Sequence, residues 1–463
     1  MKLFSLRLTT LKSKLYAIVF ASFVVRFIGF FLLPSEPTIA LAPDEGGYAE
    51  IVRLVTSNQP TTSYGGLYFI SRTLVLPAAA INNFGIDPLS SVRIIASMYG
   101  ALTLILVAFL IIQFVDKHSA YSELTLKRSN LITGLFFVFA FLPSHLLWSM
   151  LGLRESPMEF WVLCSLAAIF LAVNLQEKVT LPIALLLTIS ITLLFNTRTQ
   201  VAWVLMVTIL VSLIFSNKRR VSFTLAILTL VASGVGYASV VLQKHDEFTL
   251  VATDGSATDG SATDGSACVD PNEIIVLQGK EYQCTKTGTR RDLSDLQNPG
   301  KFIVEETIAI PNRHKSNQVA AASAIQTLSC PLTEESETDK YFCLAWRAPY
   351  MAATFLFRPL IGIDTTSTPS LMAAIENIAW LGAFIFIVIL LIRKRRLAFI
   401  GPLAPSLIFF MLYCVGAGSY EGNMGTAFRH KSLILWVILL LLASAIVAEK
   451  RPNSRNESAQ KGV

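Results

Sequence analysis

Apolar residues fill this chain in long runs that short polar segments separate. About ten runs are close to the length that crosses the hydrocarbon core of a membrane, and they cover residues 15–33, 91–115, 131–152, 158–174, 181–196, 200–215, 221–242, 371–392, 398–417 and 432–448. Runs of this kind predict membrane-spanning helices. The first run is too long for a typical signal peptide, so we predict an uncleaved anchor, with a signal peptide cleaved after Ala40-Leu-Ala42 as the alternative.

Composition supports the same class of protein. The 463 residues are 53% hydrophobic and only 15% charged, which excludes an ordinary soluble fold. The formal net charge of +7 does not indicate a nucleic-acid partner, because the basic residues form short clusters between the apolar runs. Such clusters orient spans in the membrane. We therefore predict an all-α integral membrane protein whose surrounding partner is membrane lipid.

The basic clusters predict the topology. If the chain crosses the membrane about ten times, the basic loops and both termini lie in the cytoplasm. No outer segment holds an Asn-x-Ser/Thr acceptor, which favours a bacterial plasma membrane over a eukaryotic lumen. The predicted parts are a transmembrane module at 1–242 with a first outer loop at 35–90, an extracytoplasmic insert at 243–350, further spans at 351–448 and a cytoplasmic tail at 449–463.

The first outer loop carries the adjacent carboxylates Asp44 and Glu45. Pro43 and the glycines that follow interrupt the pattern on both sides, so the pair is predicted to begin a short amphipathic helix. Carboxylates complement a helix N-terminus, and an acidic cap in a solvated loop is the structural alternative to a catalytic role. The semi-apolar stretch from Tyr64 to Phe84 is a poor span and predicts one or two helices at the membrane interface.

The outer insert begins with a repeated Ala-Thr-Asp-Gly-Ser unit across residues 252–267. This composition predicts a flexible linker, and a calcium-binding repeat is the alternative. The part that follows is expected to form a small domain with two disulfides, preferably Cys268 with Cys284 and Cys330 with Cys343; four reduced thiols are the alternative.

Cationic groups stand at the predicted outer ends of later spans. They are candidates to bind a donor phosphate, because guanidinium groups bind phosphate through paired hydrogen bonds: Arg154, Arg198, Arg429, His430 and Lys431. Each has a structural alternative. Arg154 could belong to an ion-paired hairpin, and Arg198 could extend its side chain to the membrane surface. His430 could be a structural hydrogen-bonding residue, and Lys431 could anchor its span. Arg26 and Arg93 lie inside apolar runs and are predicted to be structural partners.

Three further side chains complete the candidate site. Tyr48, Glu155 and Glu421 are candidates to contact or orient an acceptor. A carboxylate can take the proton of an acceptor hydroxyl while arginines stabilise a departing phosphate. The chain has no zinc-ligand spacing, P-loop, serine elbow or dinucleotide glycine pattern.

Several short motifs resemble membrane-embedded GT-C glycosyltransferases of the protein O-mannosyltransferase and aminoarabinose transferase kind. They are Asp44-Glu45-Gly-Gly-Tyr48-Ala-Glu50, the arginine-led segment from Arg93 to Thr103, the hairpin from Pro143 to Glu155, and Arg429 before the last apolar run. The hairpin departs from the family in one respect, because Glu155 stands where a single Asp is commoner. Across residues 1–215, the order of these motifs and the side of the membrane predicted for them agree with the family. The rest of the chain matches the family mainly in hydropathy.

The resemblance implies a GT-C bundle with interfacial helices and a polyprenyl-phosphate-linked sugar as donor. It implies that Asp44 is the general base, with Glu45 as its neighbour or as a metal or acceptor contact. Family members differ in metal dependence, so a divalent metal stays open and no other cofactor is predicted. Asp44 and Arg429 are expected to converge on one outer-facing cavity.

We therefore predict an inverting hexosyl- or pentosyltransferase that acts at the outer face on a glycan, lipid or protein acceptor. One alternative is an O-antigen-type polymerase or ligase, which would not need the early Asp-Glu loop. Another is a transporter or flippase of lipid-linked sugars, which should contain repeats or broken spans; none is recognisable in the sequence. A catalytically inactive member of the same fold is a further alternative.

Overall fold

A computed structural model describes fourteen stretches of the chain, with gaps between them. They are residues 2–33, 43–58, 71–119, 125–176, 178–216, 218–241, 248–252, 274–277, 280–286, 337–361, 364, 368–394, 403–420 and 424–447. The linker at 252–267 beyond its first residue, Glu421 and the tail at 449–463 lie outside these stretches.

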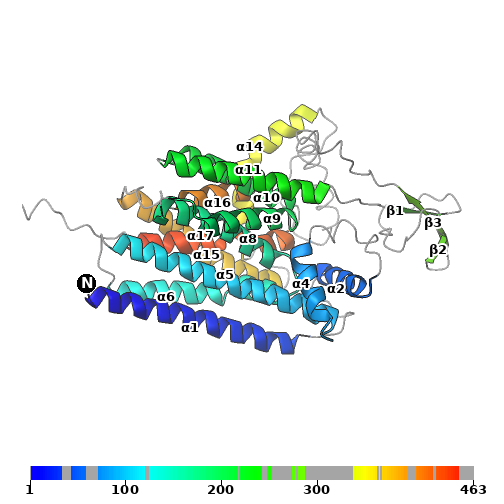
Figure 1. The fold of residues 1–463 in the computed structure, drawn as a ribbon, viewed down its shortest axis with the longest axis horizontal. Helices are drawn as coiled ribbons and strands as arrows, with labels where there is room; N and C mark the ends of the chain where they lie inside the picture. Colours follow the sequence, from blue (N-terminus) through cyan, green and yellow to red (C-terminus); the bar gives the residue numbers. More distant parts are fainter. Residues whose placement is uncertain are drawn as a thin grey trace, which may run out of the picture.

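The described chain is a bundle of helices (Figure 1). Its first half comprises α1 (Lys2–Leu32), α2 (Pro43–Thr56), α4 (Arg72–Asn82), α5 (Pro88–Ser119), α6 (Leu126–Ala140), α7 (Pro143–Met150), α8 (Glu155–Phe170) with the π-helical turn η3 (Leu171–Gln176), α9 (Leu181–Phe195), α10 (Thr199–Ile214) and α11 (Arg219–Val241). The second half comprises α14 (Glu337–Phe357), α15 (Thr368–Lys394), α16 (Ala404–Tyr420) and α17 (Met424–Val447).

The bundle is that of a multi-pass membrane protein. Within the described residues, six helical segments are long and apolar enough to cross a membrane: α1, α5, α8 continued by η3, α11, α15 and α17. The bent pair α6 and α7 gives a seventh if it counts as one span, and α9, α10 and α16 are shorter apolar helices. The expected all-helical membrane part is confirmed, whereas the number of crossings and the GT-C arrangement stay predictions.

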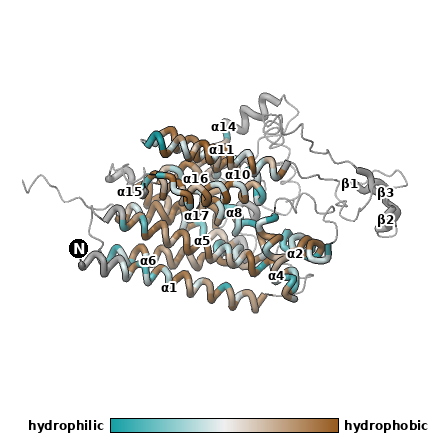
Figure 2. The backbone as a smooth tube through the Cα atoms, viewed as in Figure 1, coloured by the Kyte–Doolittle hydropathy of each residue, from teal (hydrophilic) through white to brown (hydrophobic). Residues whose placement is uncertain are grey.

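α17 is the centre of the bundle. The apolar stretch of α17 that could cross the membrane is 100% buried within the protein, whereas the corresponding stretch of α1 is only 22% buried. Trp436 of α17 is completely enclosed, and α17 packs against α5, α8, α15 and α16. Figure 2 shows apolar residues along the length of the bundle helices. Exposed aromatic rings on α1, among them Phe20 and Phe31, suit contact with lipid tails.

The helices of the predicted first outer loop lie together at one end of the bundle. Figure 1 shows α2 and α4 at the end where α1 finishes, away from the N-terminus. Both pack on α5 and on each other around Tyr48, Val52, Leu74 and Val92. The predicted helix that begins with the acidic pair is confirmed as α2. α4 confirms a helix in the later part of the Tyr64 to Phe84 stretch, whose residues up to 70 lie outside the described chain.

One predicted span is broken. The run at 131–152 forms α6 and α7, which are bent by 45° across the two residues Phe141 and Leu142. Pro143 begins α7, where its missing N–H costs no helical hydrogen bond. The expectation that the chain holds no broken span is therefore wrong at this place, where Pro143, Ser144 and His145 interrupt the apolar run.

The segment predicted as an extracytoplasmic insert contains a small antiparallel sheet. β1 (Phe248–Ala252) and β2 (Ile274–Leu277) pair on either side of β3 (Lys280–Lys286), in the order β1-β3-β2. Phe248 lies opposite Lys286, and Leu277 lies opposite Lys280. The sequence analysis did not predict these strands.

The expected disulfides stay predictions. Cys284 lies in β3 and Cys343 in α14, but the structure describes only the backbone of these two residues. Cys268 and Cys330 fall outside the described residues. The buried Cys164 and Cys414 are free thiols within the bundle.

Candidate functional site

The candidate side chains stand at the beginnings of helices that meet at one end of the bundle. Asp44 lies in the first turn of α2, Arg154 caps α8 and Arg198 caps α10. Arg429 lies in the second turn of α17. Helix N-termini favour negative charge, so these ends suit carboxylates and anionic ligands.

Arg429 joins two carboxylates from different helices. Its Nη1 lies 3.0 Å from Asp44 Oδ2, and its Nε lies 3.0 Å from Glu155 Oε1. The Asp44 side chain is 40% exposed, whereas Arg429 and Glu155 are 14% and 2% exposed. Asp44 is thus the carboxylate that a molecule from the water phase can reach. The expected proximity of Asp44 and Arg429 is confirmed, and their roles stay predictions.

His430 extends this cluster to α10. Its Nε2 lies 3.3 Å from Glu155 Oε1 and 2.7 Å from Arg198 Nη1. Two neighbours compete for one ring nitrogen, so the protonation state of the imidazole decides which contact is a hydrogen bond. The structure therefore links Arg198, His430 and Glu155 with Arg429 and Asp44 in one chain of polar contacts.

Tyr48 and Arg154 face the same group of charges. The pKa of Tyr48 is raised to about 12 because its side chain is buried, and Arg154, Glu155 and Asp44 all act on it electrostatically. Burial alone would lower the pKa of Arg154, but the nearby Tyr48, Glu155 and Asp44 raise it above the ordinary arginine value. Both groups therefore keep their protons at neutral pH and can donate hydrogen bonds.

Glu45 has a different environment from Asp44. Arg93 of α5 donates to both of its carboxylate oxygens, with Nε···Oε1 at 2.5 Å and Nη2···Oε2 at 3.1 Å. The backbone N–H of Gly152 also donates to Oε1, at 3.1 Å. This buried carboxylate ties α2 to α5 and to the turn before Arg154. Its contacts are those of an anchor for the site, and the expectation that Arg93 is a structural partner is confirmed.

Lys431 lies away from the other cationic candidates. Its Nζ donates to the backbone oxygen of Arg358 and, at 3.1 Å, to Asn377 Oδ1. Side chains two positions apart on a helix do not share a face, so Lys431 and Arg429 point in different directions. The structure brings together all the expected phosphate-binding residues except Lys431, which holds the segment after α14 against α15 and α17.

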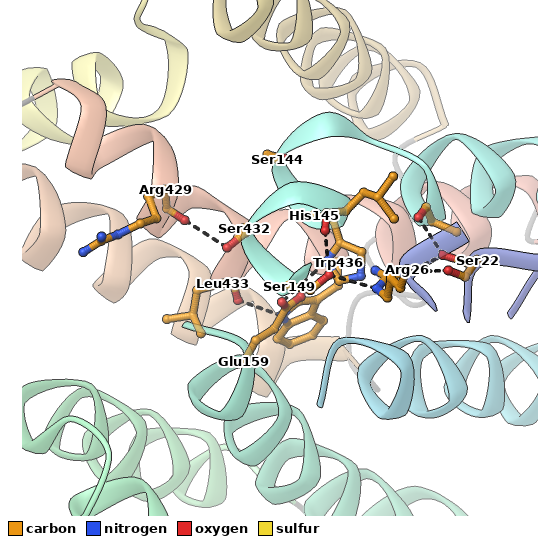
Figure 3. A network of polar contacts seen from close by, with 12 residues as sticks. Ser22, Arg26, Ser144, His145, Ser149, Glu159, Arg429, Ser432, Leu433 and Trp436 are labelled. Atoms are coloured by element: carbon orange, nitrogen blue, oxygen red, sulfur yellow. Dashed lines mark hydrogen bonds and ion pairs between the residues drawn. The ribbon is translucent and has the colours of Figure 1, made fainter. Parts of the chain in front are cut away.

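A second polar group lies among the helices, and Figure 3 shows the Arg429 side chain pointing away from it. Arg26 donates to Ser149 Oγ at 2.9 Å and to Ser22, which confirms its expected structural role. His145 Nδ1 lies 3.6 Å from Glu159 Oε2, and both side chains are buried.

Sequence reasoning missed Glu159 and Glu376. Glu376 of α15 accepts from the backbone N–H of Ser144 at 3.0 Å and from Trp380 Nε1 at 3.2 Å. A usable signal existed, because an ionisable residue inside an apolar run is costly unless it has a partner. Glu159 also follows Glu155 by one helical turn.

No metal centre is visible among the described residues, where no three His, Cys, Asp or Glu side chains are arranged to hold an ion. The possible divalent metal stays a prediction.

Comparisons of this chain with family models, with curated proteins and with solved structures find no match. The fold and the site together define a class of protein. It is a multi-pass membrane protein in which half-buried arginines meet one buried and one partly exposed carboxylate where several helices begin.

Proposed function

We propose that this protein is a membrane glycosyltransferase that uses a polyprenyl-phosphate-linked sugar and acts at the extracytoplasmic face. The observation that carries the proposal is the pairing of Asp44, a partly exposed carboxylate, with Arg429, which also holds the buried Glu155. A base that substrate can reach beside fixed positive charge is the arrangement that sugar transfer from a phosphate requires.

The proposed step uses these groups as follows. The oxygen of an acceptor hydroxyl attacks the anomeric carbon of the donor sugar and inverts it, while the bond from that carbon to the phosphate oxygen breaks. The hydroxyl proton passes to the Asp44 carboxylate, and the lipid phosphate leaves with the bonding electron pair. Glu155 and His430 hold the Arg429 end of the site in place. A divalent metal is left open, and no step is assigned to one.

Sugar transfer by purified protein tests the proposal. The full chain is reconstituted with radiolabelled polyprenyl-phosphate sugars and a panel of glycan and lipid acceptors, and the covalent product is measured. We expect Asp44→Asn to lower transfer by about 100-fold or more. Glu50→Gln is the matched control, because Glu50 is a partly exposed carboxylate of the same helix that pairs with Arg53 three residues away. No product from any donor, or full activity in Asp44→Asn, would remove the proposal.

A second candidate function is transport of a lipid-linked sugar. The 45° break between α6 and α7 favours it, because discontinuous helices build the substrate sites of many transporters. The buried side chains of His145 and Glu159, with His145 Nδ1 3.6 Å from Glu159 Oε2, lie close to this break. Movement of a labelled donor across a vesicle bilayer without covalent product would support transport over transfer. An O-antigen-type polymerase or ligase has no observation of its own in the described structure.

A further inference from the structure

The cationic groups of the site differ in what they already contact. Arg429 is paired with two carboxylates, and Arg198 contacts His430. Lys431 donates to the backbone oxygen of Arg358. A ligand that bound mainly to these groups would have to displace contacts that the protein itself supplies.

Tyr48 and Arg154 differ from these groups. The Tyr48 side chain is 0% exposed, and its hydroxyl has no hydrogen-bond partner among the residues the structure describes. The same holds for two buried atoms of Arg154, Nε and Nη1. Arg429 Nε and both oxygens of Glu155 also lack a hydrogen bond among the described residues, but Arg429 Nε and Glu155 Oε1 form an ion pair at 3.0 Å. Buried donors are nearly always paired in native proteins, so the three donor atoms of Tyr48 and Arg154 indicate a missing acceptor. Mutual electrostatic interaction, shared with Asp44 and Arg429, places both groups at the same cluster.

The charges of the cluster indicate which kind of acceptor is missing. The guanidinium groups of Arg154, Arg198 and Arg429 carry three positive charges, and the carboxylates of Asp44 and Glu155 carry two negative charges. With a neutral imidazole, one positive charge remains. Because a buried net charge is costly, an anion suits this place better than a cation or a neutral ligand.

We propose that the Tyr48 hydroxyl and the Arg154 guanidinium form the seat for one phosphate oxyanion, with Arg154 Nε and Nη1 and the Tyr48 O–H as its donors. This assignment rests on the proposed function for the identity of the group that carries the phosphate. It gives Tyr48 a ligand-binding role and gives Arg429 the separate role of holding Asp44 and Glu155. Guanidinium groups suit this task because two N–H donors match two phosphate oxygens.

Anion-dependent stabilisation of the full-length protein tests the seat. The melting temperature is measured in detergent with and without inorganic phosphate, and in phosphatidylcholine nanodiscs with and without a small fraction of polyprenyl phosphate. An anion that binds only the folded state raises the melting temperature. Stabilisation by inorganic phosphate shows a seat open to free phosphate, and stabilisation by the lipid alone shows a seat that needs the lipid carrier; both support the seat.

Tyr48→Phe is the decisive variant, because it removes one oxygen atom and little else. We expect anion affinity to fall by about 10-fold or more, while the melting temperature without anion stays equal or rises, since the hydroxyl has no partner to lose. Arg154→Gln should weaken binding further. Arg53→Gln, an exposed arginine of α2, is the matched control and should bind as the unmodified protein does.

The result that overturns the seat is either no stabilisation by any of the anions, or equal stabilisation in Tyr48→Phe, Arg154→Gln and the unmodified protein. This outcome is separable from failure of the proposed function. Anion binding that depends on Tyr48 and Arg154 without any sugar transfer leaves the seat and removes the glycosyltransferase. Sugar transfer that is unchanged in Tyr48→Phe and Arg154→Gln supports the glycosyltransferase and removes the seat.

Discussion

Arg429 Nη1 lies 3.0 Å from Asp44 Oδ2, although Arg429 lies near the start of α17, the last helix, and Asp44 at the start of α2, close to the beginning of the chain. This contact brings together at the site two segments that are far apart in the sequence. It joins a carboxylate that is 40% exposed to an arginine that is 14% exposed. Removing either partner should therefore have different consequences.

Asp44→Asn should affect function far more than stability. A partly exposed ion pair contributes about 0–1 kcal/mol to the free energy of unfolding, so the melting temperature should change little. Arg429→Gln should be the more damaging change, because it also removes the arginine that pairs with the buried Glu155, at a cost of about 3 kcal/mol or more. Chemical unfolding of the two variants beside the unmodified protein checks this order, and equal destabilisation would contradict it.

Glu45 and Arg93 should be strongly coupled. Breaking a buried pair by changing one partner costs about 3–5 kcal/mol, because the other charge stays buried and unpaired. We expect Glu45→Gln and Arg93→Met each to destabilise by an amount in this range, and the double variant to lose clearly less than the two changes added. A double-mutant cycle by thermal or chemical unfolding measures the coupling. Strict additivity would show that the two side chains do not support each other.

Gly100 should not tolerate a larger residue. A Cβ atom there would lie 2.5 Å from Ser149 Cβ and 3.3 Å from Arg26 Nε, so something must move. Gly100→Ala is expected to cost about 1–3 kcal/mol of stability through this overpacking. Gly134→Ala is the matched control, since a Cβ at Gly134 meets nothing within 4 Å. Ser149→Gly should partly restore stability in the Gly100→Ala background, and no recovery would place the clash elsewhere.

Asp364 should make stability depend on pH in the acid range. The hydrogen bonds that Arg358 donates, at 2.9 Å and 2.5 Å, lower the pKa of Asp364 below its ordinary value. A carboxylate whose pKa is lower in the folded state stabilises the fold above its unfolded pKa of about 3.9. That contribution is lost as the pH falls through the folded value. Melting temperatures from pH 7 down to pH 3 should fall more steeply for the unmodified protein than for Asp364→Asn, and parallel curves would contradict this.

Local pattern was sufficient for the membrane class and for many helix positions. The apolar run at 91–115 lies within α5, the run at 158–174 continues from α8 into the π-helical turn η3, and the run at 432–448 is helical in α17 as far as Val447. Segments of that length must satisfy their own backbone hydrogen bonds in lipid, which favours helices. Pro43 and the carboxylates after it likewise predicted where α2 begins, since the first turn of a helix favours both. Pattern failed at the α6–α7 break, where the run at 131–152 was predicted as one span although Pro143 and Ser144 interrupt it, and at the small sheet in the insert.

The sequence by itself determined that this is a helical membrane protein with charged residues at the ends of its apolar runs. Length and polarity of a run are local properties, and lipid imposes helices on such segments. Only the tertiary structure decided how those charges are paired: Glu45 with Arg93, Asp44 and Glu155 with Arg429, and Lys431 with a backbone oxygen away from them. Partner choice depends on which helices pack together and on which face each side chain leaves its helix, and neither is encoded in a run of neighbouring residues.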